Sequence, residues 1–319
     1  MRDDCFMTQT AQQPLRGDYA LVIGESLVDV VGGARHPGGS PMNVAVGLAR
    51  LGRPVELATW FGRDDDGALL SNHLAGSHVD LVPGSRGADH TSTAQVRFDD
   101  TGSASYLFDL EWQLPVDFVD DVAAPVPVVV HTGSIAAVLQ PGAERVATVV
   151  ERLAGRPTVS FDVNIRPQII GTVDEVRPLA EKLVRLSDIV KASDEDLTWL
   201  YPDRPPVASA RDWAGAGPSL VVCTKGADGV TAITRDGEID VPAPDVQVAD
   251  TVGAGDAFMA GLLHALWGAG LLGHGAHDGL KHIDATTLRQ ALDVATKVAA
   301  ITLRRPGANP PWMSELVLN

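Results

Sequence analysis

Short apolar runs alternate along the chain with longer stretches in which apolar residues recur every three to four positions. The runs are continuous, which is typical of strands buried on both faces of a parallel sheet. The longer stretches have the period of helices that cover such a sheet. We therefore predict an α/β fold, a three-layer sandwich with a mostly parallel central sheet. The runs begin at Tyr19, Val55, Val126, Pro157, Ser187 and Ser219, and helices are predicted at 42–51, 67–74, 143–153, 176–186 and 194–200.

One region, residues 91–110, departs from this rhythm. Apolar Ala94, Val96 and Phe98 alternate there with polar neighbours, ahead of a DDTG turn. Such alternation predicts a hairpin with one wet face. Together with strands at about 27–37, the hairpin would form a small sheet. That sheet would be either an extra edge hairpin or a lid over a site at the carboxyl end of the main sheet.

Composition and charge narrow the classes of partner. The chain has 319 residues, of which 45% are hydrophobic and 21% charged, with 41 acids against 25 Lys and Arg for a formal charge of −16. These proportions are ordinary for a globular protein. A surface of that sign repels nucleic acid and anionic lipid, so neither is an expected partner.

The two cysteines and the first residues bear on location. Cys5 and Cys223 indicate neither a disulfide framework nor a metal site, which fits a reducing, cytoplasmic compartment. Residues 1–18 are polar and lack the apolar centre of a signal peptide. We therefore expect a disordered tail followed by one domain at 19–319.

Two glycine-rich stretches are candidates for chemistry. GAGLLG at 268–273 has the letters of the dinucleotide-binding fingerprint. It follows a predicted helix instead of a strand, and no acid stands about 20 residues further on, so a dehydrogenase is not favoured. The GxxxxGK[ST] phosphate loop is absent from the sequence.

The second stretch, DTVGAGDAF, has the features of an anion site. Gly253, Ala254 and Gly255 precede an apolar helix, and their backbone N–H groups are free to bind an anion. By itself, Asp256 would be a first-turn residue stabilised by the helix dipole. Beside an anion site it can also accept a hydroxyl proton during phosphoryl transfer.

This stretch resembles the C-terminal signature of the ribokinase-like, or pfkB, family of carbohydrate kinases. Other segments resemble further family motifs in the expected order, so the resemblance runs from about Tyr19 to the end of the chain. Fructokinases are the members most similar to it. The segments are GGSPMNVAVGLARLG at Gly38, FGRDDDG at Phe61, DVNIRP at Asp162, KASDEDL at Lys191 and TKGADG at Thr224.

The resemblance implies roles for residues around the transferred phosphate. Asp256 is implied to be the catalytic base, and the glycine turn before it the anion hole. Arg166 is implied to lie near the substrate or the phosphate, where its planar donor fork suits oxyanions. Asp250 and Thr251 match positions that bind a monovalent cation such as K⁺ in family members. Taken alone, Asp250 would be a local turn cap.

The resemblance also implies a sugar site near the front of the chain. Asp29 is implied to bind sugar hydroxyls, since a carboxylate accepts bidentate hydrogen bonds. Gly38 and Gly39 would let the sugar approach the backbone, and Asn43 offers a donor and an acceptor. As isolated residues they would be a loop acid, a turn and a helix cap.

For ATP and Mg²⁺, one implied motif departs from the family pattern. The family commonly has Asn-x-x-Glu, whereas this chain has Ser193 and Asp196. A shorter acid can still order metal-bound water, because Mg²⁺ keeps several waters. Either Asp196 or Glu195 would take that role. The implied nucleotide contacts are Ser193, Thr224, Gly226, Gly229, Gly253 and Gly255.

The charges that follow the lid strand bear on whether the sugar is acidic or neutral. Kinases of acidic sugars tend to place an Arg after the lid strand, whereas this chain has Asp109 and Glu111 there. These acids would repel a carboxylate. They favour a neutral sugar, and because the motifs most resemble those of fructokinases, the resemblance implies phosphorylation of D-fructose to fructose 6-phosphate.

Other functions stay open at this point. 2-Keto-3-deoxygluconate kinase, ribokinase and nucleoside kinase are alternatives, as is a catalytically silent sugar-binding regulator on the same fold. The presence of Asp256 beside an intact glycine turn favours an enzyme over a regulator. The exposed edge of the lid sheet would allow a homodimer.

Overall fold

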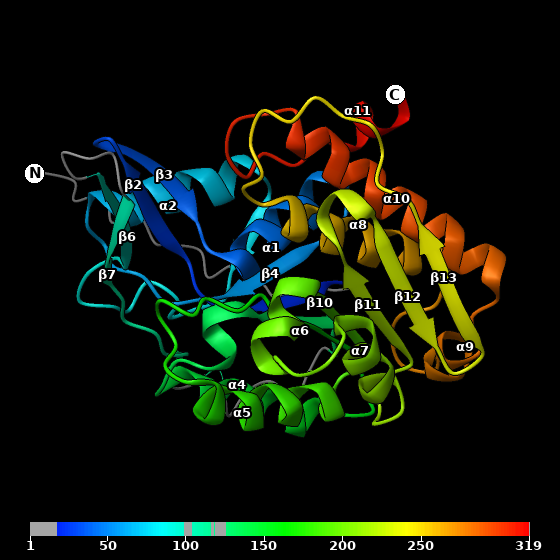
Figure 1. Ribbon diagram of the computed structural model, residues 1–319. Coiled ribbons are helices and arrows are strands. Elements are labelled where there is room, and N and C mark those ends of the chain that lie inside the picture. Colours follow the sequence, from blue (N-terminus) through cyan, green and yellow to red (C-terminus); the bar gives the residue numbers. More distant parts are fainter. Residues whose placement is uncertain (1–17, 99–103, 116–117, 119–125, 319) are drawn as a thin grey trace, which may run out of the picture.

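A nine-stranded sheet forms the centre of the protein, with helices on both faces (Figure 1). The structure is a computed structural model that describes residues 18–98, 104–115, 118 and 126–318. Neighbouring strands are parallel from β11 to β5, and β12 and β13 add an antiparallel hairpin at one edge. In spatial order the strands are β13 (Gly237–Val241), β12 (Val230–Thr234), β11 (Leu220–Thr224), β10 (Ile189–Ser193), β9 (Thr158–Asp162), β8 (Val129–Gly133), β1 (Ala20–Ile23), β4 (Val55–Ala58) and β5 (Val79–Leu81). The predicted α/β sandwich with a mostly parallel sheet is confirmed.

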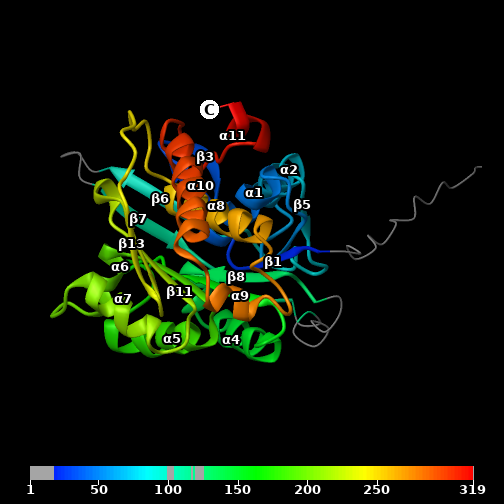
Figure 2. The same cartoon turned by 90° about the vertical axis from the view of Figure 1, so that its right-hand side faces the viewer.

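Two layers of helices enclose the sheet. Figures 1 and 2 show α4 and α5 on one side of the sheet and α1, α8 and α10 on the other. The first layer contains α4 (Gly142–Leu153), α5 (Val173–Leu186), α6 (Asp194–Leu200) and α7 (Pro206–Ala214), and the second contains α1 (Ser40–Arg50), α2 (Asp65–Gly76), α8 (Ala254–Gly268) and α10 (Ala285–Leu303). Short elements complete the described chain: α9 (His277–Lys281), α11 (Met313–Leu318) and 3₁₀ turns at Ser134–Ala137 and Gly226–Asp228. Among the described residues, no helix is both long and apolar enough to cross a membrane.

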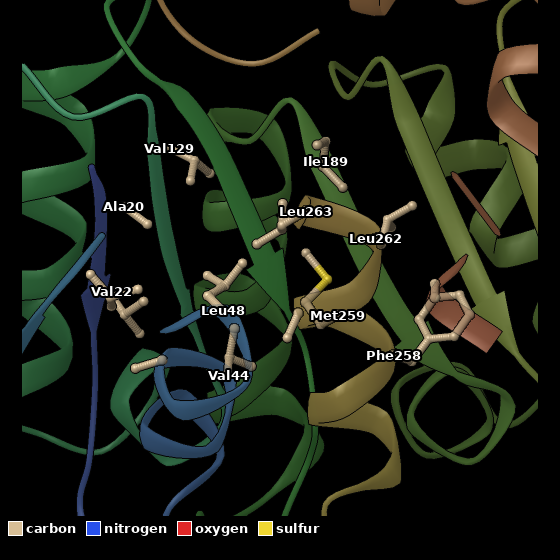
Figure 3. Close-up of a cluster of buried hydrophobic side chains, with 14 of the residues drawn as sticks. Ala20, Val22, Val44, Leu48, Val129, Ile189, Phe258, Met259, Leu262 and Leu263 are labelled. Atoms are coloured by element: carbon tan, nitrogen blue, oxygen red, sulfur yellow. The ribbon is translucent and has the colours of Figure 1, made fainter. Parts of the chain in front are cut away.

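The core between the sheet and the α1 and α8 layer is apolar and fully enclosed (Figure 3). Side chains from both helices pack there against strands β1, β8 and β10, as their helical periodicity predicted. The residues of this contact are Val44 and Leu48 of α1, Met259, Leu262 and Leu263 of α8, and Ala20, Val22, Val129 and Ile189 of the strands.

The predicted small sheet is present beside the main one. Its order is β3 (Ala34–Gly38), β2 (Leu27–Val31), β6 (Thr93–Phe98) and β7 (Ala104–Asp109), with β2 and β6 parallel and the other pairs antiparallel. The predicted DDTG turn and the N-terminal tail with Cys5 lie outside the described residues.

The FGRDDDG motif ties this small sheet to α2. Asp64 caps α2 by accepting the Gly67 N–H at 2.8 Å. The same carboxylate accepts the Thr91 N–H at 2.8 Å and its hydroxyl at 2.5 Å. Since Thr91 lies two residues before β6, one acid fixes both the start of a helix and the entry to the small sheet.

Helices α1 and α8 cross at very close range. A Cβ atom placed on Gly47 of α1 would lie 2.6 Å from the Cβ of Ala260 of α8. Gly47 follows Asn43 by four residues, and Ala260 follows Asp256 by four, which is about one helical turn in each case. The crossing therefore brings Asn43 and Asp256 next to each other.

Gly47→Ala is expected to lower the free energy of unfolding by about 1–3 kcal/mol, because the added methyl group overpacks this crossing. Chemical denaturation measures the change. Gly76→Ala is the matched control, since a Cβ atom there meets nothing within 4 Å. Equal stabilities of the two variants would contradict the close crossing.

Candidate active site

The first turn of α8 begins inside the predicted glycine turn. Gly253 is the residue before the helix, and its φ of 73° lies in the left-handed region that favours glycine. Ala254 and Gly255 are already helical, which corrects the expectation that they precede the helix. The N–H groups of Gly255 and Asp256 lie in the first turn, where helix geometry supplies no acceptor. This turn can bind an anion.

The carboxylate of Asp256 is buried, with 5% of the residue exposed, and is held by polar groups from two other segments. Ser40 Oγ donates to its Oδ1 at 2.7 Å, and Asn43 Nδ2 donates to its Oδ2 at 2.8 Å. Asn164 Nδ2 lies 2.7 Å from Ser40 Oγ and 3.4 Å from Asp256 Oδ1. These donors orient the carboxylate beside the N–H groups of its own helix.

Asn43 was predicted as a sugar ligand. In the structure its amide nitrogen donates a hydrogen bond to the Asp256 carboxylate. Ser40 and Asn164 were not singled out from the sequence. Ser40 is the first residue of α1, and Asn164 has a φ of 39° in the irregular segment after β9. In the sequence, the only signal for Ser40 is a polar residue at a helix start, and the only signal for Asn164 is a polar residue after a buried strand.

The residues predicted to bind sugar lie where β2, β3 and α1 meet. A Cβ atom on Gly38 would lie 2.3 Å from Asp29 Oδ2, so only glycine leaves room for this carboxylate. Gly39 has a φ of 111° and precedes α1. Because Gly38 and Gly39 lead directly to Ser40, the segment connects Asp29 with the residues that hold Asp256.

Two acids in this region, the buried Glu25 and the half-buried Asp29, have raised pKa values. Burial raises the pKa of Asp29, while the nearby charges of Arg166 and His36 act in the opposite direction. Burial raises the pKa of Glu25 to about 7, although its carboxylate accepts the Ala136 N–H at 3.0 Å. Arg166 is exposed, and its charge acts on both acids. Glu25 was not predicted as a site residue.

The two predicted nucleotide motifs lie side by side at the carboxyl ends of β10 and β11. Ser193 is the register partner of Thr224 in these parallel strands. Gly226 and Gly229 follow in a 3₁₀ turn and its end, both with positive φ. A Cβ atom on Gly229 would lie 2.1 Å from the Val241 carbonyl oxygen, so the backbone turns tightly there.

Asp196 completes the capping box at the start of helix α6, whose N-cap is Ser193. Its Oδ2 accepts the Ser193 N–H at 2.8 Å, and Ser193 Oγ accepts the Asp196 N–H at 3.0 Å, which forms a capping box. Its Oδ1 accepts the Ile165 N–H at 2.7 Å. Each oxygen keeps a lone pair, which fits contact with Mg²⁺ through water. Glu195 is exposed in the same first turn.

Asp250 joins the two loops that flank α8 and α10. Its Oδ1 accepts the Val252 N–H at 3.0 Å, and its Oδ2 accepts the Gly307 N–H at 2.8 Å. These bonds lower its pKa. Asp250 therefore caps the turn before α8, and Thr251 beside it is exposed.

Comparisons with known proteins agree with the fold. The profile of the pfkB family carbohydrate kinases matches residues 16–315. A fructokinase from Rhizobium leguminosarum bv. trifolii is 35% identical over 264 residues, which is 77% of this chain and 79% of that protein. Both findings point to a kinase that acts on carbohydrates, and the chain belongs to the pfkB family of carbohydrate kinases.

Two solved structures share this architecture. Aminoimidazole riboside kinase from Salmonella enterica, complexed with aminoimidazole riboside and an ATP analog, has a TM-score of 0.76 at 27% identity and covers 94% of this chain and 99% of that one. A fructokinase double mutant from Vibrio cholerae O395, in its fructose, ADP and potassium ion bound form, has a TM-score of 0.72 at 26% identity and covers 94% and 95%.

The raised pKa of Glu25 has a consequence for stability. The neutral acid is favoured in the folded state, so this group stabilises the fold below its unfolded pKa of 4.5 and loses that contribution as the pH rises to about 7. Glu25→Gln should therefore gain stability relative to the wild type over this range, by on the order of 3 kcal/mol. Urea unfolding at several pH values measures the difference. A difference that does not change with pH would contradict the burial of an ionisable group here.

Proposed function

We propose that the protein transfers the γ-phosphoryl group of ATP to the O6 hydroxyl of D-fructose. The main support for this proposal is the buried Asp256 carboxylate, which Ser40 and Asn43 hold by hydrogen bonds at the first turn of α8. A base and an anion site in one helical turn suit the transfer of a phosphoryl group to a hydroxyl.

In the reaction, Asp256 accepts the proton of the sugar hydroxyl as its oxygen attacks the γ-phosphorus. The bond from this phosphorus to the bridging oxygen breaks, and that oxygen leaves with ADP. The N–H groups at Gly255 and Asp256 stabilise the negative charge on the transferred group. Asp196 or Glu195 would hold Mg²⁺ through water, and the ion, when bound, would neutralise phosphate charge.

The choice of fructose rests on relatives and on charge. The relative from Rhizobium is named a fructokinase, and the structure from Vibrio cholerae contains fructose. Asp29, whose carboxylate is close to Gly38, suits the hydroxyls of a neutral sugar. The two acids expected after the lid strand, Asp109 and Glu111, support a neutral sugar less strongly than predicted, because both contact other side chains. Glu111 accepts the Trp60 indole N–H at 2.9 Å, and Asp109 lies 3.1 Å from His90.

The loop at Asp250 is proposed to bind a monovalent cation. The Vibrio cholerae fructokinase structure contains a potassium ion. Asp250 keeps a lone pair on each oxygen beside its bonds to Val252 and Gly307, and Thr251 adds a hydroxyl. K⁺ bound there would stabilise the loop that leads into the anion site.

Asp256→Asn is expected to lower kcat with D-fructose by about 100- to 10,000-fold, because the amide cannot accept the proton. The binding of MgATP should stay at the wild-type value, and the variant should remain folded although one of the two oxygen acceptors of this side chain is lost. A coupled assay of ADP release measures the rate. Asp203→Asn, on an exposed turn, is the control. Near-normal turnover in Asp256→Asn would refute the role of the base.

Asp29→Ala is expected to raise the KM for D-fructose about 10- to 100-fold, because charge-assisted hydrogen bonds to the sugar are lost. The KM for ATP in the same variant serves as the internal control and should change little. Equal effects on the two KM values would show that Asp29 does not face the sugar.

A further inference from the structure

A buried ion pair lies beneath the first turn of α8. Lys191 Nζ is 2.8 Å and 2.9 Å from the two carboxylate oxygens of Asp162. The side chains are 5% and 0% exposed. The two residues are register partners on the adjacent strands β10 and β9, so the sheet itself holds them together.

The ammonium group of Lys191 lies against the backbone of α8. Ile189, two residues earlier on β10, packs in the core with α1 and α8, and side chains two positions apart point to the same face of a strand. A Cβ atom on Gly255 would lie 3.2 Å from Lys191 Nζ. The contact therefore places a positive charge directly behind the N–H groups of the proposed anion site.

A gain in the stability of the fold does not by itself explain why an ion pair is buried here. Removing two charges from water costs several kcal/mol per ion, and apolar residues of similar volume often stabilise a fold as well or better. The neighbouring positions Val190, Ala192 and Phe161 are buried and apolar, so these strands accept such side chains. An ion pair at this place is therefore a candidate for a functional role.

The charges around Lys191 show what it balances. Carboxylates of three residues interact with it: Asp162, Asp196 and Asp256. Burial opposes the charge of this ammonium group, but the carboxylates outweigh burial and the pKa of Lys191 is raised. Burial raises the pKa of Asp162 to about 6, so both partners are charged at neutral pH. His131 on β8 is neutral there, because burial and the charge of Lys191 lower its pKa to about 3.

We propose that Lys191 is a positioning residue of the phosphoryl-transfer site. Its ammonium group supports the first turn of α8 from the sheet side and supplies positive charge behind the N–H groups of Gly255 and Asp256. Asp162 holds the ammonium group in place. The inference rests on the proposed function, since the charge assists a group that becomes negative during transfer. A charge fixed before the substrate binds needs no rearrangement in the transition state.

Three variants separate this role from a purely structural one: Lys191→Met, Asp162→Asn and the double variant. Each single change leaves one buried partner unpaired and should lower the unfolding temperature, whereas the double variant should regain stability. We expect kcat with D-fructose to fall on the order of 100-fold in Lys191→Met and in the double variant, with little change in the KM for ATP. Asp162→Asn keeps the cation and should lose less.

The double variant gives the result that overturns the proposal. If it regains wild-type kcat together with its stability, the pair only stabilises the fold. If kcat stays low although the unfolding temperature recovers, the charge itself is required.

Hydrogen exchange keeps this test independent of the substrate. In the double variant, the hydrogen-bonded amides of residues 257–260, at the start of α8, should exchange faster than in the wild type, with α10 as the internal reference. Absence of turnover by the wild type with D-fructose would overturn the proposed function. The exchange rates would then still decide whether Lys191 positions α8, and unchanged rates would contradict that role.

Discussion

The close crossing of α1 and α8 brings together groups that are more than 200 residues apart in the chain, such as Ser40 and Asp256. Gly47 lies so near Ala260 that neither helix can slide along the other without a steric conflict. A shift by one turn, about 5.4 Å, would separate the donors on α1 from the carboxylate on α8. The packing of two apolar helix faces therefore sets a hydrogen-bond geometry at their N-terminal ends (Figure 3).

The sheet completes the site from below. The carboxyl ends of β9, β10 and β11 provide Asp162, Ser193 and Thr224. Lys191 Nζ lies 3.2 Å from the position that a Cβ atom would take on Gly255 of α8. Parallel strands place their carboxyl ends at one edge, which is where ligands bind in open α/β folds. In the proposed reaction the N–H groups of α8 meet the incoming phosphate, and the buried Lys191 adds positive charge behind them.

Much of this arrangement could be predicted from the sequence, because it depends on local patterns. Continuous apolar runs indicated six of the nine strands of the main sheet, and the glycine turn before Asp256 indicated a candidate anion site. The pattern missed β5, which has three residues, and the β12–β13 hairpin, whose second strand is largely exposed. It also missed α7, where few positions are apolar and buried.

The groups that surround Asp256 could not be found in the same way. Ser40, Asn164 and Lys191 each look like ordinary polar residues in their own segments, and only the fold shows that they meet. Asp196 shows the same limit, since its family position suggested a metal role but did not reveal that its oxygens accept the N–H groups of Ser193 and Ile165. Long-range contacts of this kind depend on helix crossing and strand order, which a single sequence leaves open.

The most direct test of the proposed kinase function is the specificity of phosphoryl transfer. With MgATP in a coupled assay of ADP release, kcat/KM is measured for D-fructose, D-ribose, adenosine and 2-keto-3-deoxygluconate, each with and without K⁺. If the proposed function is correct, kcat/KM is highest for D-fructose. A preference for 2-keto-3-deoxygluconate, or no turnover with any of the four, would contradict it.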